Sequence, residues 1–451
     1  MHVQSKVTVL SGLFSLAAGQ LVGTNKPEVH PSLSWQTCTG PGRCTTVPGK
    51  IVLDSNWRWT HQKGGYNNCY TGNKWDTSVC TSNEACAANC EVEGADYSGT
   101  YGITTSGNAL TLKYRTNDNI GSRVYLMSTD EQYQMFTMNG NEIAFDVENS
   151  DLGCGLNGAV YFVSMDADGG KARNPTNKIG AKYGAGYCDS QCPRDLKWIG
   201  GKGNVEGWKN IGNDPNSGIG NIGACCAEMD LWEANAESFA LTPHPCSTSS
   251  FTTCSPSTCG GTYGDDRYAG VCDADGCDLA PFRHGNKDFY GPGKTINTSK
   301  KFTVVTQFSG SGTSLTAIKQ YFIQDGKKFT VPGSKYVSGG TEITESFCKA
   351  VQPIFKDAKK FEEVGGLSQM GKATGNPMVL TLSIWDDGFA NMLWLDGERY
   401  PLTRDASEPG VPRGRCPSTG SEPATVREKF RNAKVTYSNI KFGPIGSTYT
   451  L

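Results

Sequence analysis

The cysteines of this chain limit its fold more than any other feature. Eighteen cysteines, an even number, are spread from Cys38 to Cys416 in a chain of 451 residues. Zinc sites need closely spaced ligand sets, usually with histidine. The chain has only five histidines, and none belongs to a CxxC…HxxxH arrangement. We therefore predict that the cysteines form disulfides, which requires an oxidising compartment.

The first residues have the pattern of a secretory signal peptide. Lys6 precedes an apolar stretch that runs to Leu16, and the small residues Ala17-Ala18-Gly19 follow. An amphipathic first helix is the alternative, but the small residues favour cleavage. We predict a signal peptide over residues 1–19 and a secreted, extracellular chain over 20–451. No later stretch of the sequence is as long and apolar as a membrane span.

Composition excludes several classes of partner. The formal charge is −2, so the chain has no basic field for nucleic acid and no polybasic patch for a membrane surface. Only 19% of the residues are charged and 56 are glycine, which favours a loop-rich β protein over a helical one. The sequon Asn297-Thr298-Ser299 is a candidate glycosylation site in a secreted chain.

Short runs of β-branched and aromatic residues alternate with turn signals along the chain. Ile143, Phe145 and Val147 alternate with Ala144 and Asp146, which predicts a half-buried strand. The predicted strands include Lys50–Trp59, Ala109–Tyr114, Arg123–Met127, Gln132–Met138, Glu142–Val147, Ala159–Met165, Lys301–Phe308, Met378–Trp385 and Lys434–Phe442.

A helical period is clear only over Ile354–Ala373, where Gly365-Gly366 splits it into two short pieces. The pattern predicts an all-β chain, a large antiparallel β-sandwich with long loops that disulfides hold in place. We see no internal repeat, and we predict one domain.

Three acidic residues lie within six positions beside a Cys-Cys pair. On a regular strand Glu228 and Asp230 share a face, but Glu233 falls on the other. The three converge only if the strand has a bulge or turn between Asp230 and Glu233. Met229, Leu231 and Trp232 should then pack beneath them.

This cluster has two simpler interpretations. It could be an exposed polar strand edge, or a calcium site, although it lacks the alternating Asp/Asn ligands and Gly of calcium loops. Glycoside hydrolysis requires a pair of carboxyl groups, one to protonate the departing oxygen and one to attack the sugar. A third carboxylate can then orient the nucleophile and hold a proton.

Several tryptophans flank polar residues instead of lying in apolar runs. Any single tryptophan is more often a core residue. Beside a carboxylate cluster, however, indole faces together with polar neighbours favour a groove that binds sugar rings. The tryptophans in question are Trp57, Trp59, Trp385 and Trp394.

These residues resemble a known family. Glu228-Met-Asp230-Leu-Trp-Glu233-Ala-Asn, followed by Ala240-Leu-Thr-Pro-His244-Pro-Cys246, is similar to glycoside hydrolase family seven, the secreted eukaryotic cellulases. The resemblance runs from Pro31-Ser-Leu-Ser-Trp35 to the segment that ends at Ser447. It implies a curved jelly-roll sandwich and a single catalytic domain over 20–451. Because the sequence after Cys416 contains one more predicted strand but no Ser/Thr/Pro-rich stretch, we expect no linker or cellulose-binding module.

The resemblance also implies the catalytic roles. Glu228 would be the nucleophile and Glu233 the general acid and then base, in a retaining double displacement. Asp230 would hydrogen-bond Glu228 and tune its protonation. Asp189 and His244 would support the site. The mechanism implies no metal and no cofactor.

Substrate-binding positions follow from the same resemblance. Trp57 and Trp59 match sugar platforms toward the entrance, whereas Trp385 and Trp394 match platforms close to the cut. The groove-lining positions are Asn157, Tyr161, Gln191 and Lys197. The residues that match those holding the departing cellobiose are Arg267, Asp275, Arg283 and Arg413.

Loop lengths separate the two functional kinds in this family. The extended loop within Cys254–Cys277 is typical of cellobiohydrolases, which enclose the substrate in a tunnel and act from the reducing end. A short segment at Tyr114–Ser122 and Gly388 beside Phe389 would leave the tunnel more open. We expect exo action, with endo action as the alternative.

The resemblance implies nine disulfides that use all eighteen cysteines. The pairs are Cys38–Cys44, Cys69–Cys90, Cys80–Cys86, Cys154–Cys416, Cys188–Cys226, Cys192–Cys225, Cys246–Cys272, Cys254–Cys259 and Cys277–Cys348.

The expected partners are cellulose and cello-oligosaccharides, bound by a monomer. A glucan-binding lectin is the alternative from another class, but it would not need both Glu228 and Glu233. A structural wall protein would not explain tryptophans beside carboxylates.

Overall fold

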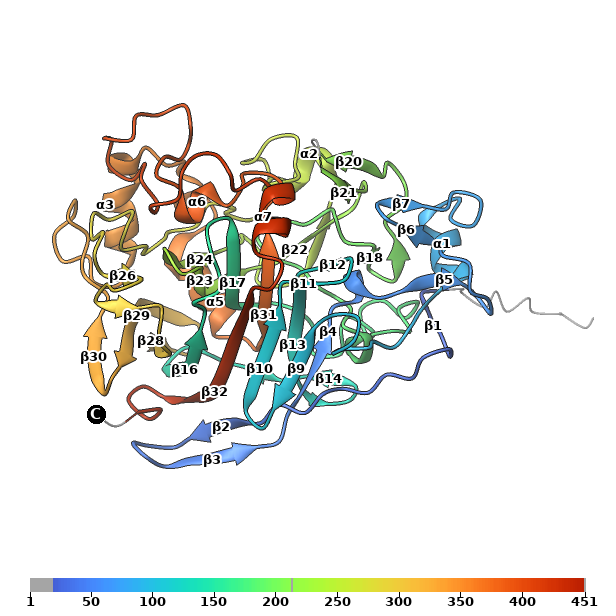
Figure 1. The fold of residues 1–451 in the computed structure, drawn as a ribbon, viewed down its shortest axis with the longest axis horizontal. Helices are drawn as coiled ribbons and strands as arrows, with labels where there is room; N and C mark the ends of the chain where they lie inside the picture. The colour runs from blue at the N-terminus through green and yellow to red at the C-terminus, as the bar shows by residue number, and fades with distance from the viewer. Residues whose placement is uncertain (1–18, 212–213, 450–451) are drawn as a thin grey trace, which may run out of the picture.

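The fold is known from a computed structural model that describes residues 19–211 and 214–449 (Figure 1). The predicted signal peptide lies outside the described residues, except for Gly19. No helix within the described ranges is long and apolar enough to cross a membrane.

Two large sheets form the body of the molecule. The nine-stranded sheet has the order β3-β2-β32-β16-β28-β29-β30, with β10 and β9 added beside β32. Its strands are β2 (Trp35–Cys38), β3 (Cys44–Val47), β9 (Ile103–Ser106), β10 (Ala109–Lys113), β16 (Asn141–Glu148), β28 (Phe302–Ser311), β29 (Ser314–Gln324), β30 (Lys327–Thr330) and β32 (Lys434–Pro444).

The eight-stranded sheet has the order β14-β13-β31-β17-β23-β24, with β15 beside β31 and β4 beside β13. Its strands are β4 (Lys50–Leu53), β13 (Ser122–Thr129), β14 (Gln132–Tyr133), β15 (Met135–Phe136), β17 (Leu156–Val163), β23 (Glu228–Ala234), β24 (Phe239–His244) and β31 (Met378–Asp386). Every pairing within the two sheets is antiparallel except that of β2 with β32. The predicted fold class is confirmed.

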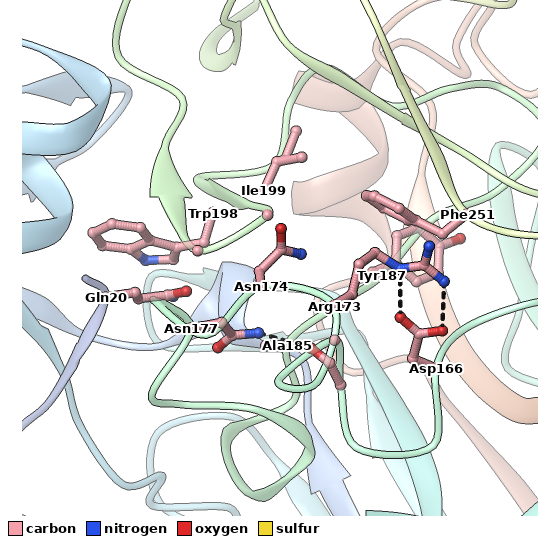
Figure 2. Close-up of a pocket in the computed structure, with 15 residues that line it drawn as sticks. Gln20, Asp166, Arg173, Asn174, Asn177, Ala185, Tyr187, Trp198, Ile199 and Phe251 are labelled. Carbon is pink, nitrogen blue, oxygen red and sulfur yellow. Dashed lines mark hydrogen bonds and ion pairs between the residues drawn. The ribbon is translucent and has the colours of Figure 1, made fainter. Parts of the chain in front are cut away.

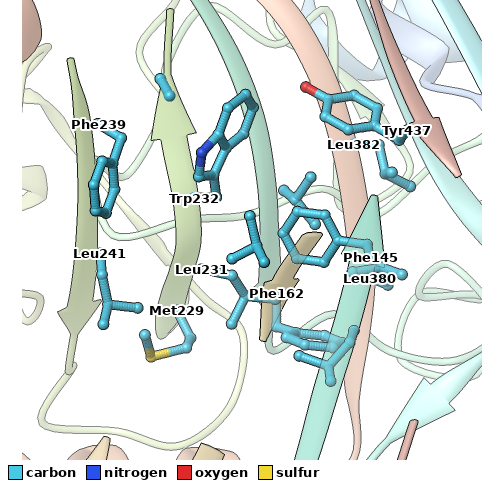
Figure 3. Close-up of a cluster of buried hydrophobic side chains, with 14 of the residues drawn as sticks. Phe145, Phe162, Met229, Leu231, Trp232, Phe239, Leu241, Leu380, Leu382 and Tyr437 are labelled. Carbon is cyan, nitrogen blue, oxygen red and sulfur yellow. The ribbon is translucent and has the colours of Figure 1, made fainter. Parts of the chain in front are cut away.

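One continuous core lies between the sheets. Phe145 of β16 and Tyr437 of β32 meet Phe162 of β17 and Leu380 of β31 there (Figure 3). Burying such side chains removes apolar surface from water, which is the main term that holds two sheets together.

The prediction that β16 is half-buried is wrong. Ile143, Phe145 and Val147 enter the core as expected, but Ala144 and Asp146 are buried too. The second face is covered because Ala144 packs in a small cluster with which Tyr449 is in contact. The hydroxyl of Tyr449 donates to Asp146 Oδ1 at 3.1 Å.

Two other predicted strands are shorter than expected. The strand expected over Lys50–Trp59 ends at Leu53, because Asp54 accepts the Asn56 N–H and caps a 3₁₀ turn, η1 (Ser55–Trp57). Gln132–Met138 is divided between β14 and β15, which pair with different strands.

The helical region begins earlier than predicted. It contains α3 (Glu345–Phe355), α4 (Lys360–Glu363) and α5 (Gly366–Thr374). The Thr344 hydroxyl caps α3 by accepting the Phe347 N–H, and Lys356 ends it in the left-handed conformation. Gly365 does separate the last two helices, as expected.

Short elements decorate the ends of the sandwich. Figure 1 shows α3 and α6 toward one end of the long axis, and α1 with β5 toward the other. The remaining helices are α1 (Asn83–Asn89), α2 (Pro256–Cys259), α6 (Leu393–Asp396), α7 (Pro423–Lys429) and the 3₁₀ turn η2 (Ala181–Tyr183).

The remaining strands form small ribbons outside the two sheets. They are β1 (Leu21–Val22), β5 (Thr60–Gln62), β6 (Tyr70–Thr71), β7 (Lys74–Trp75), β8 (Cys90–Val92), β11 (Arg115–Thr116), β12 (Asn119–Ile120), β18 (Trp198–Ile199), β19 (Lys202–Gly203), β20 (Lys209–Ile211), β21 (Asp214–Ile219), β22 (Gly223–Cys225), β25 (Thr252–Cys254), β26 (Tyr290–Gly291) and β27 (Ile296–Asn297).

Nine disulfides hold the loops, and they join the same pairs that the family resemblance implied. The widest in sequence, Cys154–Cys416, spans 262 residues. The others are Cys38–Cys44, Cys69–Cys90, Cys80–Cys86, Cys188–Cys226, Cys192–Cys225, Cys246–Cys272, Cys254–Cys259 and Cys277–Cys348. A link that closes so long a loop restricts the unfolded chain most.

Candidate active site

A bulge in β23 brings the three carboxylates to one face. Opposite β17, Val160 pairs with Trp232 and the next residue, Tyr161, pairs with Asp230, so Leu231 is an extra residue in β23. The same irregularity occurs opposite β24, between Asp230 and Glu233. An extra residue shifts the two-residue alternation by one, so Glu233 returns to the face of Glu228 and Asp230. The predicted bulge is confirmed.

The apolar residues between the carboxylates point the other way. Met229, Leu231 and Trp232 are fully buried in the core beneath the site (Figure 3). This packing fixes the backbone of β23, and with it the positions of the three carboxyl groups.

The Glu228 carboxylate is held by Ser190. The Ser190 hydroxyl donates to Glu228 Oε2 at 2.7 Å, and the Ser190 N–H donates to the same oxygen at 3.1 Å. Disulfides Cys188–Cys226 and Cys192–Cys225 flank Ser190 and tie its segment to the residues just before β23. Ser190 was not predicted from the sequence; the two cysteines that bracket it were the only available signal.

Asp230 and His244 form a buried pair. His244 Nε2 lies 3.0 Å from Asp230 Oδ2, and His244 Nδ1 lies 2.9 Å from the carbonyl oxygen of Asp273. Both ring nitrogens face acceptors, which favours the doubly protonated imidazolium. Burial alone would lower the pKa of His244, but the hydrogen bond to Asp230 and the charges of Asp230 and Glu228 raise it.

Glu233 has a different environment from Glu228. Asn157 Nδ2 donates to Glu233 Oε1 at 2.9 Å, while Asn157 Oδ1 accepts the Ala234 N–H at 2.9 Å. Burial raises the pKa of Glu233 well above its usual range, and the charges of Asp230 and Glu228 add to the effect. A carboxyl group in this environment remains protonated at a pH where an exposed one is ionised.

Asp189 closes the other side of the cluster. Tyr187 donates its hydroxyl to Asp189 Oδ2 at 2.6 Å, and the Tyr161 hydroxyl lies 3.0 Å from that of Tyr187. The Arg123 guanidinium lies 3.3 Å from the Tyr187 ring centroid. Burial and the charge of Glu228 raise the pKa of Asp189, and the same two causes raise that of Asp230. Neither Tyr187 nor Arg123 was predicted from the sequence.

The predicted sugar platforms form two separate groups. Trp385 and Trp394 stack with centroids 6.3 Å apart and planes 28° apart. Trp57 and Trp59 lie near η1 and β5, toward the opposite end of the long axis from α6, which carries Trp394 (Figure 1). The indole N–H of Trp57 donates to the Ile120 carbonyl at 3.1 Å, and that of Trp394 donates to Asp387 at 3.0 Å.

The remaining predicted binding residues are mostly engaged with the protein itself. Arg267 pairs with Asp275 at 2.7 Å. Arg283 is buried between Asp278 and Asp357, at 2.5 and 2.7 Å.

Three predicted binding residues remain, Gln191, Lys197 and Arg413, and they differ in whether their side-chain nitrogens have hydrogen-bond partners. Gln191 Nε2 donates to the Ala274 carbonyl at 2.7 Å, and Lys197 Nζ to the Arg58 carbonyl at 3.1 Å. Burial lowers the pKa of Lys197 to about 8. The Nε of Arg413 is buried and has no partner among the described residues.

A small cavity lies between the loops that follow β17 and β18 (Figure 2). Tyr187, Asn174, Asn177 and Trp198 are among its lining residues, whereas Glu228, Asp230 and Glu233 are not. Arg173 pairs with Asp166 at its rim, as the dashed lines in Figure 2 show. The cavity therefore excludes the three carboxylates, although Tyr187, which donates to Asp189, lines it.

The described residues also contain three groups that bring cysteine sulfurs within reach of a shared metal ion. Every cysteine in these groups belongs to a disulfide, and Asp396 is the one other member. Disulfide sulfurs are not thiolates, so these groups do not offer the ligands of a zinc site.

Comparison with known proteins gives consistent results. A family model described as glycosyl hydrolase family 7 matches residues 22–449. The structure of a cellobiohydrolase from Melanocarpus albomyces complexed with cellotetraose is 52% identical, with a TM-score of 0.92, and the match covers 96% of this chain and 100% of that one.

Two further solved structures are similar. A family 7 cellobiohydrolase from Daphnia pulex is 47% identical, with a TM-score of 0.91 over 95% of this chain and 100% of that one. An endocellulase, EGI, from Humicola insolens is 34% identical, with a TM-score of 0.80 and the same coverage.

Proposed function

Because this chain belongs to glycosyl hydrolase family 7, we propose that it is a secreted cellulase. It hydrolyses β-1,4-glucosidic bonds with retention and releases cellobiose processively from reducing chain ends. The observation that carries the proposal is the bulged strand β23, which presents Glu228, Asp230 and Glu233 on one face in unlike environments.

The first step uses the difference between the two glutamates. Glu233 carries a proton because burial and nearby negative charge raise its pKa. It donates that proton to the glycosidic oxygen while Glu228 attacks the anomeric carbon. The Ser190 hydrogen bonds fix Oε2 of Glu228, so Oε1 is the attacking atom.

The second step regenerates the enzyme. Glu233, now ionised, takes a proton from water, and that water displaces Glu228 from the sugar with net retention. The His244 cation beside Asp230 offsets negative charge in the cluster. Asp230, paired with His244, and Asp189, bonded to Tyr187, adjoin Glu228 and tune its ionisation.

Binding groups flank this centre. Trp57 and Trp59 stack on sugar rings toward the entrance, and Trp385 and Trp394 stack close to the cut. Asn157, Tyr161, Gln191 and Lys197 contact hydroxyl groups along the chain. Arg413 holds the departing cellobiose together with Arg267, Asp275 and Arg283.

A contact between two loops supports exo action. Tyr263, within the Cys254–Cys277 loop, packs edge-on against Phe389, which follows β31, with centroids 6.1 Å apart. The Tyr263 carbonyl accepts a hydrogen bond from Arg194 at 2.6 Å, which anchors the loop. Loops that meet in this way enclose a bound chain and slow its escape. The cellobiohydrolase structures are also more similar to this chain than the endocellulase.

Endo action is the second candidate, and a specific feature favours it. Strands β11 and β12 form a tight hairpin in which only residues 117 and 118 separate the paired Thr116 and Asn119. So compact a hairpin covers little of the neighbouring groove. A chain could then enter from the side.

Secretion is part of the same proposal. Nine disulfides are expected of a protein from an oxidising compartment. Asn297, at the end of β27, is half-buried and carries the proposed glycan. The proposed working form is a monomer.

The test measures new reducing ends released from amorphous cellulose, divided into soluble and insoluble fractions. Mostly soluble ends, with β-cellobiose as the main first product, are expected. Glu228→Gln is the control, and it should bind cello-oligosaccharides without turnover. Many insoluble ends with mixed products would establish endo action, and binding without any new ends would establish a lectin.

A further inference from the structure

An exposed tyrosine lies beside one of the proposed sugar platforms. The Tyr66 side chain is among the most exposed large apolar groups of the described chain, at 75%. Its ring centroid is 6.2 Å from that of Trp59, and the two planes differ by 28°. The two rings are therefore stacked, with Tyr66 the more exposed of the pair, and we call them the Trp59–Tyr66 patch.

The protein holds the Trp59 ring from its inner side. The buried His61 ring packs at 4.3 Å between centroids, and His61 Nε2 is fixed by Glu93 Oε1 at 2.8 Å. The Trp59 indole N–H donates to Asn68 Oδ1 at 2.7 Å. The buried neighbour of Trp59 is thus His61, and its exposed neighbour is Tyr66.

The turn that carries Tyr66 is also well anchored. Gln62 N donates to the Asn67 carbonyl at 2.7 Å, and Gly64 N donates to Glu91 at 3.1 Å. Gly64 has a positive φ of 66°, which glycine adopts without strain. Disulfide Cys69–Cys90 follows directly. The exposure of Tyr66 is therefore a feature of a fixed turn.

We propose that Tyr66 is a further substrate-binding residue that extends the Trp59 platform outward and captures a β-1,4-glucan chain before it reaches Trp59. The apolar faces of glucose units match flat aromatic rings, and the polar residues of the turn, among them Asn67 and Asn68, match their hydroxyl groups. This inference rests on the proposed cellulase function.

Two substrates and a binding assay test it on the full chain. Tyr66→Ala should raise the crystalline-cellulose load needed for half-maximal rate by roughly two- to tenfold and weaken adsorption in the cold to a similar extent. Hydrolysis of a soluble aryl cellobioside should not change, because that substrate is too short to reach the patch. Tyr66→Phe keeps the ring and should behave as wild type.

Tyr336→Ala is the matched control, since Tyr336 is 39% exposed and contacts Phe355 away from this turn. Equal adsorption and equal cellulose kinetics for Tyr66→Ala and wild type would overturn the proposal. An equal loss on both substrates would show a structural role instead, and would also overturn it.

Failure of the proposed function has a different signature. If the wild type adsorbs to cellulose but cleaves neither substrate, catalysis is refuted while adsorption still tests Tyr66. If the wild type does neither, the two proposals fail together.

Discussion

Asn157 is the residue whose contact with Glu233 most directly sets the pH range of the proposed acid. Its amide N–H donates to Glu233 Oε1 and stabilises the ionised carboxylate, so this bond lowers the pKa of Glu233 against the larger effect of burial. Removing it in Asn157→Ala should raise that pKa further. Since hydrolysis needs the protonated form, the alkaline limb of kcat/KM should move to higher pH.

The shift should be about one pH unit, the scale of a hydrogen bond to a charged group. The measurement is kcat/KM for a soluble aryl cellobioside across pH 3–9. Asn376→Ala, which removes an exposed amide bonded to the Lys372 carbonyl, is the control. A limb that stays in place or moves to lower pH would contradict the proposed role of Glu233.

Residue identities in the site were predictable to different degrees. Glu228, Asp230 and Glu233 are close in sequence, and the adjacent Cys-Cys pair with the interleaved apolar residues favoured a shared site over an exposed strand edge. Ser190 lies 38 positions before Glu228, and two disulfides bring them together, along with backbone hydrogen bonds such as that from Cys226 N to the Asp189 carbonyl. No local pattern distinguishes a serine that binds a carboxylate from one that binds water, which is why Ser190 and Tyr187 were missed.

Among the elements, β23 was predictable and α3 was not. Three carboxylates can share a face of β23 only through a bulge, so their spacing implied the irregularity that the register contains. The helical period in the sequence was clear only from Ile354; the residue before it, Pro353, lacks the N–H that a helix interior needs. It lies near the end of α3, however, and the helix forms from its Thr344 cap onward.

The loop contact between Tyr263 and Phe389 gives a prediction at the scale of elements. Tyr263→Ala removes the ring that touches Phe389 and should let the two loops separate more often. The insoluble share of new reducing ends from amorphous cellulose should then rise by roughly two- to threefold, because a chain leaves or enters more freely. Activity on a soluble aryl cellobioside should change little.

Tyr336→Ala again serves as the control for a lost aromatic ring. An unchanged insoluble share in Tyr263→Ala would mean that this contact does not enclose the substrate. Whether a chain can enter the groove from the side, as endo action requires, would then depend on the β11–β12 hairpin alone.

At the scale of the whole molecule, alternation and turns predicted two antiparallel sheets but not which segments cover them. Strand β2 pairs in parallel with β32, about 400 positions later, at Gln36 with Lys441. Tyr449, close to the end of the chain, covers the outer face of β16. Such contacts depend on the closed fold, so no window of sequence contains them.

Buried carboxyl groups across the molecule predict how its stability depends on pH. Burial raises the pKa of Asp273 to about 6 and that of Asp396 to about 7, and it also raises those of Asp189 and Asp230. The unfolded chain loses these protons near pH 4, whereas the folded protein keeps them. Stability should therefore fall as pH rises from about 4 to about 8, by on the order of 1 kcal/mol per pH unit for each group that titrates.

Two other groups add to this dependence of stability on pH, one on the acid side and one on the alkaline side. Hydrogen bonds from His30 and Lys50 lower the pKa of Asp130 to about 2, so its contribution is present above pH 4 and is lost as pH falls. His244, with a raised pKa, contributes fully below its ordinary value and loses its contribution as pH rises. Both effects place maximal stability in mildly acidic solution.

Calorimetric Tm values from pH 2 to 9 test this dependence, and Asp396→Asn tests its cause. Asp396 Oδ2 accepts hydrogen bonds from Gly155 N at 2.9 Å and Asn235 Nδ2 at 2.6 Å, while Oδ1 is buried without a partner in the described chain. An asparagine can keep the acceptor but cannot titrate, so Tm should fall less steeply between pH 4 and 7. The exposed Asp118→Asn should leave the slope unchanged. A wild-type Tm that rises over this range, or an unaltered slope in Asp396→Asn, would show that these buried carboxyl groups do not control stability.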